Sequence, residues 1–302
     1  MIINLPRHLV LETVPAIVES TISQNRNPIS ERFTFNFDTL HFIQPAGLTA
    51  LTNIIEFLQK KNTQIDFKVD VNRAKFSNSV IKYLDDVSFF EKYLGNKLNI
   101  RSRIRDTTLT INIINIDSRF EWIDNTLIPW IKKQLTFPNT SNFETLRLCL
   151  MEIFNNISDH SQENIACLYA QHFPKWKQIQ IAISDFGIGI PTNVKKKMHF
   201  DYDSYAIRKS VEEGFSTKSV PTNRGAGLDV LRKNIVENNG GSLTILSNRG
   251  KVRIFSDSTQ MNQSNFHCAD YELSEYPGTL LNLEINSEKF DDSESEEDFQ
   301  WF

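Results

Sequence analysis

The sequence predicts an α/β protein built from two units, each made of strands and covering helices. In the first unit, alternating apolar residues over 33–37 predict a half-buried strand, and apolar residues at helical spacing over 48–58 predict a helix. In the second unit, alternation over 179–183 predicts a buried strand that ends in a glycine-rich loop. Strands that alternate with helices in this way indicate sheets covered by helices.

Length and charge limit the classes of function. The chain has 302 residues, which favours two domains over one. The net charge is −4, and much of it lies in the acidic stretch 288–302, which we expect to be disordered. Because the chain lacks a strongly basic region, its composition gives no reason to expect a nucleic acid as partner.

Cysteine usage and hydropathy bear on the cellular compartment. The three cysteines are widely spaced and form neither a metal-binding pattern nor an even-numbered disulfide set, which suits a reducing compartment. The first residues lack the pattern of a signal peptide, and no apolar run reaches membrane-spanning length. We therefore expect a cytoplasmic protein without a membrane partner.

The first unit, residues 1–100, continues the strand and helix pattern. A short apolar run at 40–43 precedes the helix, alternation over 65–71 predicts a further strand, and apolar residues over 81–94 predict two short helices. The second unit, residues 107–287, opens with an alternating strand at 109–113. The order of elements predicts a separate sheet with covering helices in each unit.

The helix expected over 143–160 carries the first candidate site residues. Its apolar positions share one face, and Glu152 and Asn156 lie one turn apart on a flanking face. A carboxylate can accept a proton from a water or hydroxyl that attacks a phosphate. An amide oxygen suits a magnesium ion that also holds phosphates. By itself such a pair more often belongs to a solvated helix face.

The buried strand at 179–183 leads into the second motif, DFGIG. Asp185 follows this strand, where a carboxylate can accept a hydrogen bond from an exocyclic amine such as that of adenine. Gly187 and Gly189 allow the backbone to approach a ligand closely or to take positive φ. The simpler alternative is a plain turn after a strand, and the motif alone is moderately specific.

Two further glycine motifs follow. Gly225 and Gly227 open a helix, whose free N–H groups would cradle phosphates. Lys218 and Arg224 come just before and could contact phosphate oxygens. Thr279 follows a glycine and opens the last apolar strand. A glycine-rich helix start is common, and a lone Gly-Thr pair is nearly uninformative, so each of these motifs is weak by itself.

Taken in order, the four motifs closely resemble those of the GHKL superfamily of gyrase, the heat-shock chaperone, histidine kinases and MutL. EIFNN is similar to the N box, DFGIG to the G1 box, NRGAGL to the G2 box, and the Gly-Thr pair to the motif beside the adenine pocket. The resemblance implies a Bergerat-type α/β sandwich with a mixed sheet, which holds ATP and Mg²⁺. It also implies a lid over the phosphates at about 190–224.

The resemblance assigns roles to individual residues. Glu152 would be the general base, Asn156 would bind the nucleotide and its magnesium, and Asp185 would anchor adenine. The other cofactor-binding residues would shape the pocket; they are Gly187, Gly189, Lys218, Arg224, Gly225, Ala226, Gly227, Leu228 and Thr279. Asp159 stands where many members carry a basic residue, which puts a phosphate contact there in doubt.

The first unit resembles a second family, without catalytic content. FTFNFDTLHFIQPAGLTALTNIIEFLQKK is similar to the strand, loop and helix of STAS domains, the anti-anti-sigma-factor fold. Phosphorylatable members carry Asp-Ser-Ser-Gly in the loop, whereas this chain has Ala46 at the acceptor position, which excludes phosphorylation there. A generic α/β domain is the alternative. The STAS-like interpretation implies a protein partner.

Together these observations predict an ATP-binding switch or ATPase fused to a STAS-like interaction domain. One alternative is a serine/threonine protein kinase of the anti-sigma type, in which Glu152 would activate a hydroxyl on a separate partner. The other is a non-catalytic nucleotide-sensing scaffold. A sensor histidine kinase is disfavoured because we find no helix with an acceptor histidine before the domain. A homodimer and the role of the apparent insertion at 256–276 stay open.

Overall fold

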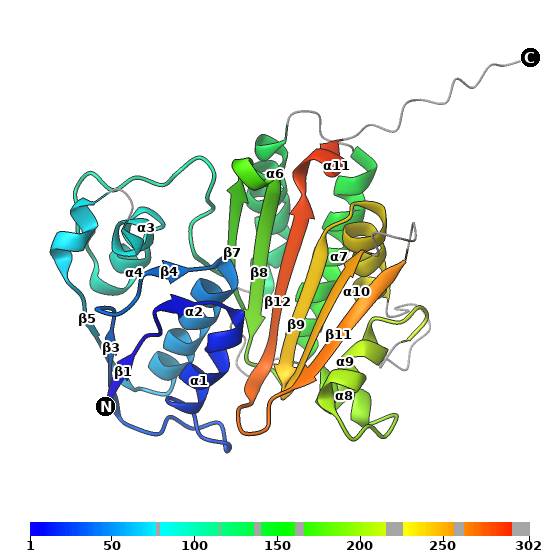
Figure 1. Cartoon of the computed structure of the whole chain (residues 1–302), viewed down its shortest axis with the longest axis horizontal. Coiled ribbons are helices and arrows are strands. Elements are labelled where there is room, and N and C mark those ends of the chain that lie inside the picture. Colours follow the sequence, from blue (N-terminus) through cyan, green and yellow to red (C-terminus); the bar gives the residue numbers. More distant parts are fainter. Residues whose placement is uncertain are drawn as a thin grey trace, which may run out of the picture.

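The computed structural model places two hydrophobic cores on opposite faces of one large sheet (Figure 1). It describes residues 1–76, 79–114, 116–135, 140–160, 166–215, 226–256 and 263–291. Side chains are not described at residues 116, 140–142, 159, 160, 226, 290 and 291. The α/β fold class expected from the sequence is confirmed.

The first unit contains two small parallel sheets, one with the order β1-β3-β5 and one that pairs β2 with β4. The strands are β1 (Ile2–Asn4), β2 (His8–Leu9), β3 (Arg32–Asn36), β4 (Phe42–Ile43) and β5 (Gln64–Lys68). Alternate residues of β3 are buried, as the sequence pattern predicts, and Phe33 and Phe35 are fully buried.

Four helices are present in the described part of the first unit. They are α1 (Val14–Glu19), α2 (Pro45–Lys60), α3 (Val80–Asp86) and α4 (Phe89–Leu94), with 3₁₀ turns at Leu11–Thr13 and Val71–Lys75. The expected helix and the two expected short helices are therefore present. Helix α2 begins with proline at its first position, where the missing N–H group costs no hydrogen bond.

A seven-stranded sheet forms the centre of the described structure, in the order β11-β10-β9-β12-β8-β7-β6. The strands are β6 (Asn112–Ile114), β7 (Ala166–Phe173), β8 (Gln178–Asp185), β9 (Ser242–Asn248), β10 (Gly250–Ser256), β11 (Ser264–Asp270) and β12 (Tyr276–Asn286). Every described pair in it is antiparallel, which corrects the expectation of a mixed sheet. Strands β7 and β8, and likewise β9 and β10, are consecutive in the chain, and short turns can join such neighbours only in the antiparallel sense. Strand β12 lies between β8 and β9 and pairs with both in the antiparallel sense through long-range contacts.

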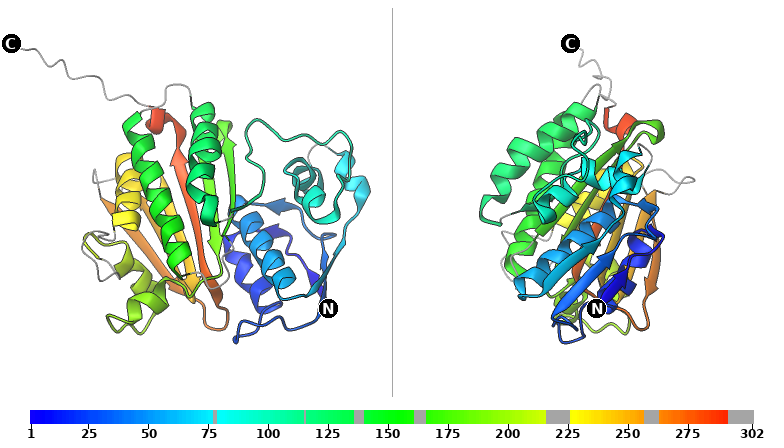
Figure 2. Two further views of the ribbon diagram at one scale, coloured as in Figure 1. Left: turned by 180° about the vertical axis from the view of Figure 1, so that it is seen from behind. Right: turned by 90° about the vertical axis from the view of Figure 1, so that its left-hand side faces the viewer.

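One face of this sheet is covered by helices from the second unit, seen in front of the sheet in the left view of Figure 2. These helices are α5 (Arg119–Trp122), α6 (Ile128–Gln134), α7 (Thr140–His160) and α10 (Ala226–Arg232), with π-helical turns at Ile123–Leu127 and Lys233–Asn238. The apolar face predicted for α7 is confirmed, because Phe143, Leu146, Leu150, Ile153 and Ile157 are all buried.

The opposite face of the sheet packs against the first unit. Helix α2 contacts β7, β8 and β12, and almost all of its residues are buried. The core of the first unit therefore extends onto the sheet and includes Tyr169, Ala182, Phe186, Leu246 and Leu280. Alternate residues of each strand face opposite sides, so one strand serves both cores.

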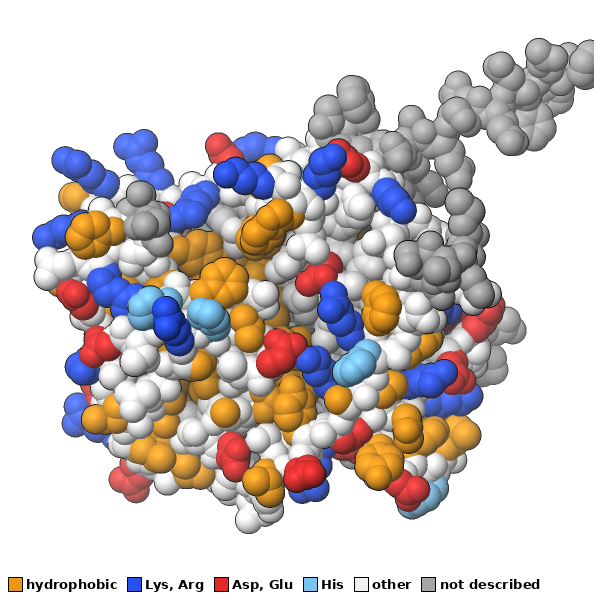
Figure 3. Space-filling view, in the orientation of Figure 1, with side chains coloured by type: hydrophobic (Ala, Val, Ile, Leu, Met, Phe, Trp, Pro, Cys, Tyr) orange, Lys and Arg blue, Asp and Glu red, His pale blue; other side chains and the backbone are white. Residues whose placement is uncertain are grey.

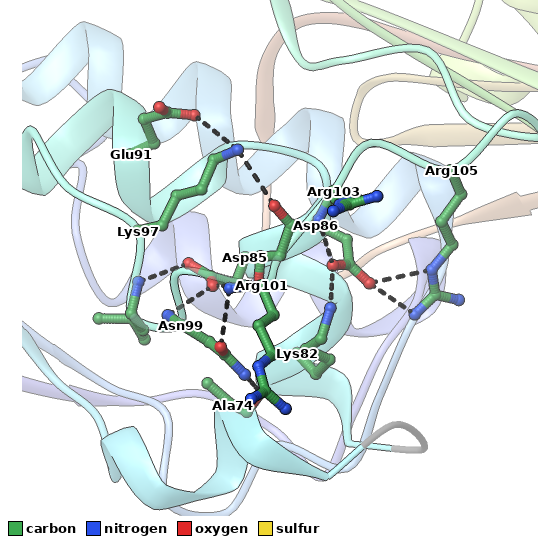
Figure 4. A network of polar contacts seen from close by, with 12 residues as sticks. Ala74, Lys82, Asp85, Asp86, Glu91, Lys97, Asn99, Arg101, Arg103 and Arg105 are labelled. Atoms are coloured by element: carbon green, nitrogen blue, oxygen red, sulfur yellow. Dashed lines mark hydrogen bonds and ion pairs between the residues drawn. The ribbon is translucent and has the colours of Figure 1, made fainter.

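The segment that joins the two units is bound to α3 by two buried carboxylates (Figure 4). Asp85 accepts hydrogen bonds from the backbone N–H groups of Leu98 at 2.8 Å and Asn99 at 2.9 Å. Asp86 accepts from the guanidinium of Arg105 at 3.0 and 3.1 Å and forms an ion pair with Lys82. These bonds satisfy the buried charges and fix the path of the connection.

The segment 256–276, which looks like an insertion, contributes the edge strand β11, and its Asp270 caps a helix described below. Of the acidic stretch 288–302, the first residues belong to α11 (Ser287–Asp291), and residues 292–302 lie outside the described residues. Within the described ranges we find no helix with the length and apolar character needed to cross a bilayer. On the face seen in Figure 3, acidic and basic side chains are interspersed.

Candidate functional site

A pocket opens between helix α7, the ends of β8 and β12, and helices α8 (Ile190–Lys195) and α10. Its described lining residues are Glu152, Ile153, Asn156, Ile157, Ile183, Asp185, Ile188, Gly189, Ile190, Asn193, Val194, Ser210, Phe215, Gly227, Leu228, Thr279 and Leu281. The set contains residues from all four sequence motifs, so the fold brings together segments that are far apart along the chain.

Asp185 lies at the floor of the pocket, at the end of β8, with only 8% of its surface exposed. One carboxylate oxygen, Oδ1, accepts a hydrogen bond from the backbone N–H of Gly187 at 2.6 Å. Burial raises the pKa of Asp185 to about 7, although the Gly187 N–H group and the charge of Arg26 act in the opposite direction. A carboxylate in such surroundings gains from a ligand that donates a hydrogen bond to it.

Thr279 lies directly opposite Asp185 in the antiparallel pair β12–β8. The preceding residue, Gly278, has φ +119°, and a β-carbon there would lie 2.2 Å from the carbonyl oxygen of Asp185. Only glycine fits that backbone conformation and that space. The Gly-Thr pair, nearly uninformative in the sequence, thus allows β12 to pass close to the pocket floor.

Helix α7 presents Glu152 and Asn156 to the pocket, both half-buried. Helix α10 crosses α7 at this point, and a β-carbon at Gly227 would lie 2.5 Å from Cγ of Glu152. The glycine therefore lets the two helices approach closely beside the carboxylate that the sequence predicts to be the general base. Leu228 lines the pocket next to it.

The remaining residues predicted to bind the cofactor differ in where the structure places them. Gly189 lines the pocket and has φ +83°, so it needs the freedom of glycine. Gly187 is not among the lining residues but holds Asp185 through its N–H group. Lys218, Arg224 and Gly225 lie outside the described residues, as does the side chain of Ala226.

Part of the predicted lid at 190–224 is packed onto the sheet. Helix α9 (Asp203–Ser210) contacts β10 and β11, and Ala206 and Ile207 in it are fully buried. The carboxylate of Asp270 caps the helix by accepting from the N–H group of Ser204 at 3.1 Å. The stretch 216–225 of the predicted lid lies outside the described residues.

Two residues beside the pocket are absent from the predictions. Ser247 of β9 is fully buried; its hydroxyl donates to the carbonyl oxygen of Gly278 at 2.6 Å and accepts from the N–H group of Ile190 at 2.9 Å. Its only signal in the sequence is a serine within an apolar strand. Arg26 of the first unit donates to the carbonyl oxygen of Gly187 at 2.7 Å, and no sequence pattern announces this contact.

The chemistry of the lining fits a purine nucleotide. The lining includes the apolar side chains of Ile183, Val194 and Leu281 together with the buried carboxylate of Asp185. An aromatic base can pack against such apolar side chains, and its exocyclic amine can donate to the carboxylate. Glu152 and Asn156 add side-chain oxygen atoms to the lining, and Glu152 lies beside Gly227 near the start of α10.

The oxygen atoms of the pocket also fit a magnesium ion that arrives with phosphates. Among the described residues, no cluster of three or more His, Cys, Asp or Glu side chains could hold a metal ion alone. Magnesium commonly takes one or two protein oxygens and completes its coordination with phosphates and waters. Asn156 could supply such an oxygen, with the Glu152 carboxylate one turn away.

Comparison with known proteins agrees with this geometry. Residues 142–263 match the model of the family described as "Histidine kinase-, DNA gyrase B-, and HSP90-like ATPase". This part of the chain therefore carries a GHKL-type domain, the class of ATPases and related kinases. The match contains the α7, β8 and α10 parts of the pocket, whereas Thr279 lies beyond it.

Solved structures give a weaker likeness. The ATPase region of Saccharomyces cerevisiae topoisomerase II is 12% identical, with a TM-score of 0.24; the match covers 41% of this chain and 33% of that one. The same region bound to ICRF-187 (dexrazoxane) gives the same values. No curated protein sequence matches the chain.

Proposed function

We propose that the chain binds ATP with magnesium in this pocket and uses it as an ATPase or as an ATP-dependent signalling switch. The observation that carries the proposal is the convergence of Asp185, Thr279, Asn156 and Glu152 on one pocket within a GHKL-type domain. Asp185 would accept a hydrogen bond from the adenine amine. Asn156 would contact the phosphates and their magnesium, which would neutralise phosphate charge.

In the ATPase reaction Glu152 would act as the general base. Its carboxylate would accept a proton from a water molecule whose oxygen forms a bond to the γ-phosphorus. The bond between that phosphorus and the β,γ-bridging oxygen would break, which leaves ADP and phosphate. The close approach of α10 at Gly227 keeps the Glu152 side chain between two helices, which would hold the base in place.

The same arrangement also suits a serine or threonine kinase of the anti-sigma type. There Glu152 would accept the proton of a hydroxyl on a separate protein, and the phosphoryl group would move to that hydroxyl oxygen. A third candidate is a nucleotide-sensing scaffold without catalysis. We favour the ATPase or switch because it requires only the residues that line the pocket, whereas the kinase requires a separate substrate protein.

The first unit, which we assign to residues 1–100, would be a STAS-like interaction domain that docks a protein partner. Its parallel β1-β3-β5 sheet with covering helices supports this assignment. Helix α2, however, packs against the large sheet and is not available to a partner, which would have to bind another surface of the first unit. Ala46, at the position of the phosphoacceptor, is buried as well.

Incubation with ATP labelled at the γ-phosphate, with and without a candidate partner, tests the proposal. Release of labelled phosphate by the wild type, and its loss in Glu152→Gln with ATP binding retained, would support the ATPase. Label on a serine or threonine of the partner would favour the kinase. Binding without turnover under both conditions would favour the scaffold.

A further inference from the structure

Arg26 does not line the nucleotide pocket, but from a tight turn in the first unit it contacts the loop that follows β8, next to Asp185. The backbone N–H of Ser23 donates to the carbonyl oxygen of Asn27 at 2.8 Å, and Arg26 takes φ +56° within the turn. Positive φ is costly for a residue with a side chain, so the surrounding bonds must hold it. The turn directs the guanidinium toward the loop after β8, where Nη1 donates to the carbonyl oxygen of Gly187.

Gly187 is one of two glycines in this loop, and both its N–H group and its carbonyl oxygen form hydrogen bonds. Its N–H donates to Asp185 at 2.6 Å, and its carbonyl oxygen accepts from Arg26 at 2.7 Å. Because glycine pays the largest entropy cost when it is ordered, two bonds at one glycine restrain the loop strongly. The first bond involves the predicted adenine anchor, and the second comes from the other unit.

The first unit also contacts the residues on either side of Asp185. Asn53 of α2 donates to the hydroxyl of Ser184 at 2.7 Å. Phe57 of α2 packs edge-on against Phe186, with ring centroids 5.3 Å apart. Since alternate residues point to opposite faces, these contacts lie behind the sheet while Asp185 faces the pocket.

The described charged and titratable groups around Asp185 come from several elements. Arg26 approaches from the turn, Tyr276 from β12, and Lys61 from the end of α2, where it lines a small hollow with Arg26. Glu152 lies in the same pocket on α7. Arg26 is the basic group whose charge lowers the pKa of Asp185, against the larger effect of burial.

We propose that Arg26 is a positioning residue of the nucleotide site, which holds the Gly187 loop so that Asp185 is aligned for the adenine amine. The inference rests on the proposed function for the role of adenine. The restraint on the loop, by contrast, is a property of the protein without nucleotide. Arg26 makes the first unit part of the base-recognition machinery, in addition to any docking of partners.

Hydrogen exchange in the full chain without nucleotide tests the restraint. We expect the amides at 186–190 to exchange about tenfold faster in Arg26→Ala, because removal of the bond to Gly187 lowers the cost of local opening. Arg26→Lys, which keeps a donor and a charge, should restore much of the protection. The control is Arg32→Ala, which removes an exposed ion pair to Asp66 in the same unit. Equal exchange at 186–190 in all four proteins would overturn the inference while the proposed function stands.

Base selectivity provides the second readout. Inosine triphosphate lacks the exocyclic amine, so the ratio of its dissociation constant to that of ATP reports on Asp185. We expect this ratio to fall about tenfold in Arg26→Ala and to recover in Arg26→Lys. Equal weakening of both nucleotides would point to a merely structural role and overturn the alignment of adenine. If the wild type bound neither nucleotide, the proposed function and the adenine role would fail together, and exchange would still decide whether Arg26 restrains the loop.

Discussion

Gly278 and Asp185 approach each other so closely that a β-carbon on the glycine would lie 2.2 Å from the carbonyl oxygen of the aspartate. Gly278→Ala should therefore destabilise the protein by about 2 kcal/mol or more, since neither the backbone of residues 185–187 nor a φ of +119° accommodates the methyl group. Denaturant unfolding measures the change. Nucleotide binding should also weaken, because β12 and the pocket floor must move apart.

The matched control for that substitution is Gly95→Ala. Gly95 also has positive φ, at +76°, but nothing lies within 4 Å of its β-carbon position. The Gly95→Ala substitution should lower the free energy of unfolding by about 1 kcal/mol, from backbone strain alone. Equal losses of stability in the two variants would contradict the claim that close packing adds to the effect of φ in making glycine necessary at position 278.

Gly227→Ala sets helix propensity against packing. Alanine stabilises a helix by about 1 kcal/mol relative to glycine, but its methyl group would overlap with Cγ of Glu152. We expect ATP turnover to fall at least tenfold, roughly 1.4 kcal/mol in the barrier, with little loss of stability. Steady-state phosphate release and thermal unfolding together measure the two effects. Unchanged turnover would mean that Glu152 need not keep its place between the helices.

Asp185→Asn should make the empty protein more stable, and more so at high pH. The folded protein holds the proton of Asp185 up to about pH 7, whereas the ordinary pKa is 3.8. As pH rises between these values, the unfolded chain releases the proton first, so the wild type loses stability. The amide removes that loss, so the gain should be absent near pH 4 and reach up to about 4 kcal/mol at pH 8. Urea unfolding across this range measures it, and a gain independent of pH would contradict the buried charge.

A fragment of residues 107–291, produced without the first unit, should be insoluble or should form oligomers with itself. Its sheet would expose the apolar side chains that pack into the core of the first unit, including Phe186, Leu246 and Leu280. Supplying residues 1–105 as a second chain should restore a soluble complex. Size-exclusion chromatography distinguishes the outcomes, and a monodisperse, folded 107–291 fragment would show that the two units do not depend on a shared core.

The sequence predicts those elements that leave a motif or a periodic apolar pattern within a short segment. The alternation in β3 and β8 and the apolar face of α7 predict elements that the structure contains, because burial on one side leaves a periodic pattern. The docking of α2 onto the large sheet was not predictable in the same way. The apolar residues in its sequence predict a buried helix, but they do not indicate which element it packs against.

The site shows the same division. Asp185 and Glu152 stand in recognisable motifs, so their meeting in one pocket could be expected. Arg26 and Ser247 could not be found in this way, because each acts through a backbone carbonyl oxygen. Because every residue has a backbone carbonyl group, such contacts require no particular residue type at the accepting position and leave no motif in the sequence. The antiparallel order of the large sheet likewise depends on long-range pairing, such as β12 with β8, that no local pattern encodes.

The central claim is that this pocket binds ATP with magnesium, and calorimetric titration of the full chain tests it most directly. We predict micromolar binding to the wild type, about 8 kcal/mol or less, that is lost in Asp185→Asn and loses its magnesium dependence in Asn156→Ala. Circular dichroism of each variant would establish that it is folded. Absence of binding by the folded wild type, or undiminished binding by Asp185→Asn, would contradict the account.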